Sequence, residues 1–353
     1  SILSTIRCGF DVLIPGSFFS SLHQISSSIL TNKETPTQID LTAVSLFVYS
    51  KYTYNLVMHL PKIPFSMKNI FHNNKIIPAS LIDNLIDEIK ESSESQQRIS
   101  QSITYLEKCL ARYHHDIRII KSLLPKGKIL EIGAYPFHLT YFLKKMGFTV
   151  SGIDLDPSRF RTIQSQNDLD VRKIDIEKEK FCFEQGEFDL IIFNEVFEHL
   201  KEPIQALAEI NRVLKNNGKL LLTTPNIYFL PHLVYFLSGK GLICDAFTAF
   251  SKPYWLGHMG HVREYSSREL RVFLERLGFK IIQIDYVQNR LFLNFKKNRH
   301  LATKEKLSVP LWVLGPLNLI NLLLVTLFPF LRENIVITAL KSEETEDLFR
   351  AKF

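Results

Sequence analysis

The feature that most constrains the fold of this chain is a regular alternation of two kinds of segment between residues 128 and 226. Short runs rich in Leu, Ile, Phe and Val, typical of buried strands, alternate with segments whose apolar residues recur every three or four positions, as on one face of a helix. This alternation predicts a parallel sheet with helices on both faces, whose ligands bind beyond the carboxyl ends of the strands. The expected strands are 128–133, 149–157, 171–177, 188–196 and 219–226, and the expected helices are 139–147 and 204–218.

The pattern resumes after an aromatic-rich, irregular stretch at 227–266, which we interpret as a substrate-side insertion. An amphipathic helix is expected over 266–279, with Ser267 as its N-cap and Gly278 as its stop. Strands are expected at 280–287 and 334–341. The fold class predicted is therefore α/β, a doubly wound, mostly parallel sheet of seven strands with helices on both faces.

The chain is expected to divide into a folded domain with appendages. Residues 1–80 form a region of unknown role, and 81–125 form a helical lead-in in which apolar residues recur at helical spacing. The α/β domain covers 126–343, and 344–353 are a polar tail.

A long apolar segment at 307–331 contains no charged residue and exceeds the ~18 apolar residues that indicate a membrane span. Prolines and asparagines interrupt it, however, and a single crossing would place 280–287 and 334–341 on opposite sides of a bilayer. We therefore expect a bent hairpin in peripheral contact with a membrane, with a buried cap or a dimer contact as the alternatives.

Composition excludes several classes of protein. A chain with 46% hydrophobic and 22% charged residues is not intrinsically disordered. The net charge of +7 is spread along the sequence without a basic block that contains aromatics, so no nucleic-acid partner is expected. The four cysteines lie far apart, which indicates a reducing compartment, the cytoplasm, with the inner face of the membrane as the possible site of association.

Two strand ends carry the residues that indicate a ligand. The first strand ends in Glu131-Ile132-Gly133, and the second ends in Asp154. An acidic side chain at the tip of the second strand is placed to accept hydrogen bonds from both ribose hydroxyls, and Gly133 allows close approach to the backbone. Together they predict a nucleoside cofactor.

Six motifs occur in the order found in one family: LEIGA, GIDLDP, KIDIE, FDLIIFNEVFEHL, NRVLKNNGKLLLTTPN and GHVREYSSREL. Over about residues 128–275 the chain resembles the class I S-adenosylmethionine-dependent methyltransferases, which have a Rossmann-like fold. The form GAYPFHLT is similar to that of members associated with bacterial surface glycans. The resemblance implies S-adenosyl-L-methionine as the cofactor.

The resemblance also implies a role for each matching residue. Glu131 and Gly133 would face the methionine end of the cofactor, and Asp154 its ribose. Asp175 and the backbone of Ile176 would contact the adenine, while Asn194 and Glu195 would lie near the methyl group. The full set of expected cofactor-binding residues is Glu131, Gly133, Ala134, Asp154, Leu155, Asp175, Ile176, Asn194 and Glu195.

The acceptor side is expected to hold the catalytic base. Because imidazole titrates near neutral pH, His199, His258 and His261 are the candidates, and each is alternatively a packing histidine. Arg263 and Tyr265 are candidate substrate contacts, although Arg263 is equally suited to a structural ion pair. The spacing of His258 and His261 lacks the adjacent ligands of a metal site, so no metal is expected.

The predicted function is methyl transfer to a small molecule or saccharide, such as a cell-surface glycan or a lipid-linked sugar. Two alternatives remain open. An NAD(P)-dependent oxidoreductase predicts a sheet without a reversed final strand. A non-catalytic scaffold that binds a membrane or a partner is suggested by Tyr135 and Phe137, which replace glycines that family members often have.

Overall fold

The computed structural model describes residues 76–237, 239, 260–288 and 320–345, all of which belong to one compact unit, Lys62–Phe353. The described residues do not include 1–75 of the predicted N-terminal region, the middle of the insertion with His258, residues 307–319 of the apolar segment or most of the polar tail.

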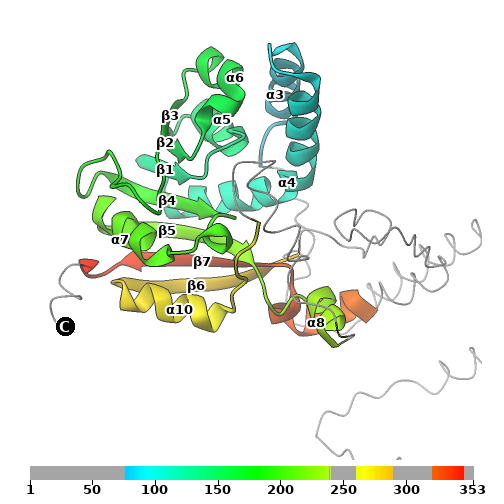
Figure 1. Cartoon of the computed structure of the whole chain (residues 1–353), viewed down its shortest axis with the longest axis vertical. Helices are drawn as coiled ribbons and strands as arrows, with labels where there is room; N and C mark the ends of the chain where they lie inside the picture. Colours follow the sequence, from blue (N-terminus) through cyan, green and yellow to red (C-terminus); the bar gives the residue numbers. More distant parts are fainter. Residues whose placement is uncertain (1–75, 238, 240–259, 289–319, 346–353) are drawn as a thin grey trace, which may run out of the picture. The chain divides into compact units, whose positions relative to one another are not determined.

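A single seven-stranded sheet in the order β3-β2-β1-β4-β5-β7-β6 forms the centre of the fold (Figure 1). The first five strands in this order, β3, β2, β1, β4 and β5, are parallel to one another, whereas β7 is antiparallel to both β5 and β6. The predicted fold class is confirmed, and the reversed β7 argues against the oxidoreductase alternative. The strands are β1 (Lys128–Ile132), β2 (Thr149–Asp154), β3 (Asp170–Lys173), β4 (Phe188–Asn194), β5 (Leu214–Pro225), β6 (Phe279–Val287) and β7 (Asn334–Lys341).

Helices cover both faces of this sheet, as Figure 1 shows. One apolar core lies between the sheet and the helices α7 and α10, and a second lies between the sheet and α3, α4, α5 and α6. The α-helices are α3 (Ala79–Glu91), α4 (Gln96–Leu123), α5 (His138–Lys145), α6 (Arg161–Gln166), α7 (Pro203–Val213), α8 (Leu230–Leu237) and α10 (Ser267–Arg276), and the 3-10 helices are η2 (Pro157–Phe160), η3 (Phe197–His199) and η4 (Pro329–Leu331).

The central strand β4 shows why the apolar runs of the sequence form strands that are buried on both faces. Ile191 and Phe193 enter the core beneath α7 and α10, while Leu190 and Ile192 enter the core beneath α4 and α5. Successive side chains of a strand point to opposite faces, so a strand covered on both sides must be apolar throughout.

The predicted end of the helix 204–218 is wrong. Helix α7 ends at Val213, and Leu214 already pairs with Phe188 in the sheet. The next pair joins Leu190 to Lys219, so the register shifts here and residues 215–218 form a bulge within β5. Strand pairing therefore overrides the helical period of the sequence at this point.

Other boundaries also differ from the prediction. The expected strand 171–177 is shorter, because β3 ends at Lys173. The helical lead-in is two helices, since the chain breaks between α3 and α4, where the Ser95 side chain caps α4. The N-cap of α10 is Ser266 and not Ser267, and Gly278 at φ +83° follows its end as expected.

The strand that follows the apolar segment, β7, lies next to β6, the strand that precedes it. Strands β6 and β7 are antiparallel neighbours, as the argument against a single membrane crossing requires. Residues 320–327 are helical, with Val325 buried and Leu327 exposed. Within the described part of the chain, no helix is both long and apolar enough to cross a membrane.

The insertion after β5 begins and ends at one point of the fold. Asn226 and Tyr265 form a parallel bridge, and the Ile227 N–H donates to the Tyr265 carbonyl at 3.2 Å. The Asn226 amide also donates to the carbonyls of Phe330 and Arg332, both at 2.7 Å. The two ends of the insertion are thus joined at the carboxyl end of β5.

Candidate functional site

Gly133 and Asp154 lie side by side at the carboxyl ends of β1 and β2. The two strands pair in register up to Ile132 and Ile153, and the Gly133 N–H donates to the Ile153 carbonyl at 2.9 Å. Gly133 adopts φ +75°, and a Cβ atom there would lie 2.3 Å from Cγ2 of Val196. Both the backbone conformation and the lack of space therefore require glycine.

The Asp154 carboxylate is 7% exposed and holds two loops together. It accepts hydrogen bonds from the N–H groups of Tyr135, at 3.1 Å, and Asp156, at 2.9 Å. Arg159 donates to it at 2.8 Å and also lies over the Tyr135 ring, 4.0 Å from its centroid. A carboxylate has about four acceptor positions, so Asp154 retains capacity for a ribose hydroxyl beside these three donors.

Glu131 is buried on the face of the sheet that α4 and α5 cover. Its carboxyl accepts a short hydrogen bond from the Thr140 hydroxyl. Burial raises the pKa of Glu131 to about 8, although the Thr140 hydrogen bond and the charge of Arg112 lower it. An ammonium group beside this carboxyl would stabilise its ionised form, which fits the methionine end of the expected cofactor.

Asn194 and Glu195 end β4 next to polar side chains of α4 that the sequence analysis missed. The Asn194 amide donates to Asp116 at 3.0 Å, and Oδ1 of Asn194 is buried without a hydrogen-bond partner among the described residues. Arg112 lies 3.5 Å from the Glu195 carboxylate. These groups fit a ligand that carries both ammonium and carboxylate charges. The sequence signal was weak, because the polar run 114–116 lies in a helix that is polar over much of its length.

The residues expected at the adenine lie around the end of β3. Asp175 accepts hydrogen bonds from the Glu177 N–H and, at 2.7 Å, from the Lys178 ammonium, which lowers the pKa of Asp175. Ile176 is buried in the core, whereas Leu155 is exposed. Asp175 thus has a local structural role, and its contact with adenine stays a prediction.

The two aromatic residues that replace loop glycines have different surroundings. Phe137 is fully buried in the core beside α5 and precedes that helix with φ +70°. Tyr135 is half-buried, and its ring meets that of Phe137 edge-on at 5.9 Å. Phe137 therefore packs into the interior, and Tyr135 is the aromatic residue that borders Asp154.

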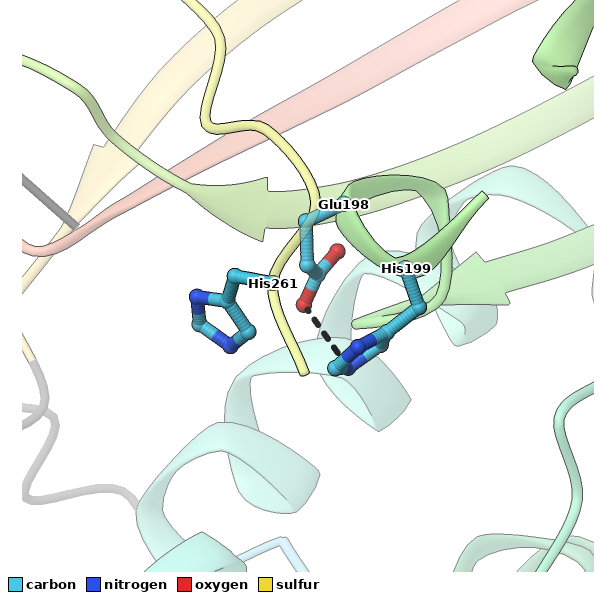
Figure 2. A group of neighbouring side chains, drawn as sticks. All are labelled: Glu198, His199 and His261. Atoms are coloured by element: carbon cyan, nitrogen blue, oxygen red, sulfur yellow. Dashed lines mark ion pairs between the residues drawn. The ribbon is translucent and has the colours of Figure 1, made fainter. Parts of the chain in front are cut away.

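On the acceptor side, Glu198, His199 and His261 converge (Figure 2). Nε2 of His199 lies 3.8 Å from Oε1 of Glu198, and the two imidazole rings have centroids 5.1 Å apart. Nδ1 of His261 lies 3.2 Å from Glu264, a buried carboxylate that the sequence analysis also missed. His232 contacts the same carboxylate at 3.0 Å.

The two carboxylates of this region have opposite pKa shifts. Burial, reinforced by the nearby charge of Glu195, raises the pKa of Glu198 well above its usual value. Burial also raises the pKa of Glu264, but hydrogen bonds with His232 and His261 outweigh it, and the net pKa is lowered. Glu264 is therefore ionised at neutral pH, and Nδ1 of both histidines faces this carboxylate.

Arg263 and Tyr265 have structural partners. Arg263 forms an ion pair with Glu269 at 2.5 Å, and Tyr265 is buried with its ring 4.7 Å from that of Phe197. Both residues also line a surface hollow of about 600 Å³ beside α7 and α10. The structural alternative for Arg263 is realised with Glu269 as its partner, and a substrate contact of either residue stays a prediction.

Comparison with known proteins gives the relatives of this chain. A ubiquinone biosynthesis O-methyltransferase of Xanthomonas campestris pv. campestris is 28% identical over 29% of this chain and 45% of its own length. A malonyl-[acyl-carrier protein] O-methyltransferase of a Paenibacillus species is 26% identical over 55% of this chain and 72% of its own. The chain spans about half the length of the first curated relatives that it matches.

Among solved structures, a SAM-dependent methyltransferase from Archaeoglobus fulgidus is 20% identical, with a TM-score of 0.43 over 67% of this chain and 94% of that one. The sequence model described as "Methyltransferase domain" matches residues 104–284, which is just over half of the chain. The chain belongs to this methyltransferase domain family, in its class I, S-adenosylmethionine-dependent form.

Proposed function

We propose that this chain transfers a methyl group from S-adenosylmethionine to an oxygen atom of a small-molecule or saccharide acceptor. The observation that carries the proposal is the convergence of Gly133, Asp154 and Glu195 at the carboxyl ends of the paired strands β1, β2 and β4. Two relatives with the word O-methyltransferase in their names support oxygen as the acceptor atom.

The residues of the chain position the reactants. The cofactor supplies a methyl group on a positively charged sulfur, which is electrophilic without further activation. Asp154 is placed to bind the ribose, and Glu131 with the polar end of β4 to bind the methionine part. Holding the acceptor oxygen in line with the methyl group then provides most of the acceleration. His199 and His261 are the candidates to accept the hydroxyl proton.

For the acceptor we propose a sugar carried on a lipid or on a cell-surface glycan. Exposed apolar side chains at the carboxyl edge of the sheet support this, because they offer a surface for a lipid or a membrane. They lie on residues 228–237, which include α8, and on residues 320–330, which the Asn226 hydrogen bonds join to the end of β5. The exposed set comprises Tyr228, Val234, Phe236, Leu237, Ile320, Leu323, Leu327, Phe328 and Phe330.

Calorimetry with S-adenosylhomocysteine and with NAD(H) tests the cofactor assignment. We expect S-adenosylhomocysteine alone to bind, with one site per chain. Binding of neither ligand would favour the non-catalytic scaffold, and binding of NAD(H) alone would favour the oxidoreductase. Mass spectrometry of glycans and lipids from cells with and without the gene tests the acceptor, and we expect a loss of 14 mass units from one species in the cells that lack it.

A further inference from the structure

We propose that Glu198, His199 and His261 bind a first-row divalent metal ion. One ligand atom of each residue lies within 4.8 Å of the other two, and Figure 2 shows the Glu198 carboxylate between the two imidazoles. The spacing of His258 and His261 in the sequence did not predict this group. Two of its members come from η3, and the third comes from the segment that returns from the insertion.

The backbone holds these two segments together. The N–H groups of Val262 and Arg263 donate to the Glu198 carbonyl at 2.8 and 3.3 Å. The Tyr265 ring packs against Phe197, one residue before Glu198. His261 therefore sits beside η3 because main-chain hydrogen bonds and a buried aromatic contact fix it there, as a pre-organised metal site requires.

Neighbouring side chains contact one polar atom of Glu198 and one of His261. The other oxygen of Glu198 and the other ring nitrogen of His261 remain available to a metal ion. Nδ1 of His261 faces the buried Glu264 carboxylate at 3.2 Å, which leaves Nε2 as the nitrogen for a metal ion. The Thr224 hydroxyl donates to Oε2 of Glu198 at 3.0 Å, and Oε1 is the oxygen nearest His199. A carboxylate behind a ligating histidine is the usual arrangement that orients the ring and raises its basicity.

The donor set determines the class of ion. Two imidazole nitrogens and one carboxylate oxygen suit Zn²⁺, Co²⁺, Mn²⁺ or Fe²⁺, and they leave open coordination positions. Ligand atoms bonded at about 2.1 Å around a tetrahedral ion lie about 3.4 Å apart, so ligand atoms that are up to 4.8 Å apart must approach one another by up to about 1.4 Å. Partial exposure of both histidine side chains, 22% and 30%, leaves them room to move.

The metal group lies next to the proposed methyl-transfer site. Adjacent residues of β5 hold the two acidic residues: Thr223 donates to Glu195 at 3.1 Å, and Thr224 donates to Glu198. If the proposed function holds, the ion would replace the two histidines in activating the acceptor: it would bind the acceptor hydroxyl and favour loss of its proton to water. A lone pair of the deprotonated acceptor oxygen then forms the new O–C bond to the methyl carbon. At the same time the C–S bond of the cofactor breaks, and its electrons remain on sulfur.

Titration of the full, metal-stripped chain with Co²⁺ and Zn²⁺ tests the site. We expect one equivalent of Co²⁺ to produce visible d–d absorption bands that Zn²⁺ abolishes by displacement. Glu198→Gln keeps the size of the side chain and an acceptor for Thr224 but removes the charge, and we expect at least a hundredfold loss of affinity. The His199→Ala/His261→Ala double variant should lose the bands altogether.

Glu202→Gln is the matched control, because it removes the same charge from an exposed position four residues along the chain. We expect its metal affinity to equal that of the wild type. Equal affinity of wild type and Glu198→Gln, or bands that survive in the double histidine variant, would overturn the site. Unfolded variants are recognised by their S-adenosylhomocysteine binding and melting temperature.

The same preparations separate this inference from the proposed function. Binding of S-adenosylhomocysteine without binding of Co²⁺ or Zn²⁺ would overturn the metal site and leave the methyltransferase assignment intact. Binding of the metal at Glu198, His199 and His261 without binding of S-adenosylhomocysteine would overturn the proposed function alone.

Discussion

At the scale of single residues, Asp154 joins the loop after β1 to the loop after β2. Its carboxylate accepts two main-chain N–H groups and the Arg159 guanidinium. Hydrogen bonds to a charged acceptor each contribute about 1.5–3 kcal/mol. The same side chain that is placed to bind the cofactor therefore also maintains the shape of the cofactor loops.

We expect Asp154→Ala to weaken S-adenosylhomocysteine binding at least tenfold, which corresponds to about 1.4 kcal/mol or more. The loss has two causes, since a ribose acceptor and the two loop hydrogen bonds disappear together. Isothermal titration calorimetry measures it. Asp156→Ala is the control, because Asp156 is the next acidic residue and its side chain bonds Ser158 instead. Unchanged affinity in Asp154→Ala would contradict the ribose assignment.

Glu131 gives the chain a pH dependence that can be measured without the cofactor. Its pKa is about 8 in the folded chain against 4.5 for an ordinary Glu. The folded state therefore binds more protons than the unfolded state between these values, and stability falls as the pH rises through this window. The contribution of the protonated carboxyl is complete below about pH 4.5 and is lost as the pH passes through about 8.

Glu131→Gln should remove this dependence, because the amide does not ionise and its oxygen still accepts from Thr140. We expect the variant to gain stability relative to wild type as the pH rises from 5 to 8, by up to about 1.4 kcal/mol per pH unit. Urea unfolding of the cofactor-free proteins at several pH values measures the difference. Parallel pH profiles of the two proteins would show that Glu131 has an ordinary pKa.

Local motifs made part of the site predictable from sequence. Gly133 directly follows β1 and Asp154 is the last residue of β2, so the expectation of a parallel pair was enough to bring them together. Arg112 and Asp116 were not predictable in this way, because they lie on a helix and meet Glu195 and Asn194 only through packing. Glu264 was missed because its histidine partners come from both ends of the insertion.

At the scale of secondary-structure elements, the capping box of α10 stabilises the helix that follows residues 261–265. The Ser266 side chain accepts from the Glu269 N–H at 3.2 Å, and Glu269 accepts from the Ser266 N–H at 2.9 Å. This reciprocal pair defines where the segment 261–265 ends and the helix begins.

Ser266→Ala should lower the free energy of unfolding by about 1 kcal/mol, the usual cost of removing an N-cap. Denaturant unfolding measures this change. Arg268→Ala, at an exposed position two residues along, is the control, because Ser267 accepts a hydrogen bond from the Tyr286 hydroxyl at 2.7 Å. A larger effect in Arg268→Ala would contradict the observed boundary. Neither variant should change the affinity for S-adenosylhomocysteine, because neither side chain touches the strand ends that carry the cofactor residues.

Element types were more predictable than element ends. The strand 334–341 begins and ends where its apolar run does, because β7 pairs with β5 and β6 along its whole length. The helix 204–218 was extended too far, since Leu214 continues the helical period and yet pairs with Phe188. Periodicity records which face is apolar, whereas pairing partners that are distant in sequence decide where a strand begins.

At the scale of the whole molecule, the exposed apolar residues of α8 and 320–330 distinguish one edge of the domain. Leu237 is 82% exposed and Leu327 is 61% exposed, on segments that both connect to the end of β5. Large exposed apolar groups gathered at one place indicate a binding surface for a partner or a lipid.

We expect the full chain to float with liposomes and Leu237→Ser/Leu327→Ser/Phe330→Ser to remain mostly in the soluble fraction. The triple variant loses apolar contact area and keeps all charges, so a difference reports on hydrophobic insertion. The control Ile204→Ser/Val272→Ser removes exposed apolar side chains from α7 and α10 and should float like the wild type. Equal flotation of all three proteins would end the membrane proposal.

The bridge between Asn226 and Tyr265 also has an evolutionary consequence. The two residues join the ends of the insertion between β5 and α10. The chain between them can therefore lengthen, shorten or be exchanged without shifting the register of the sheet. The last residues of the insertion bring His261 next to η3. Replacing the insertion with that of a homologue that uses another acceptor should therefore change the acceptor preference. The strand ends proposed to bind the cofactor should remain unaltered.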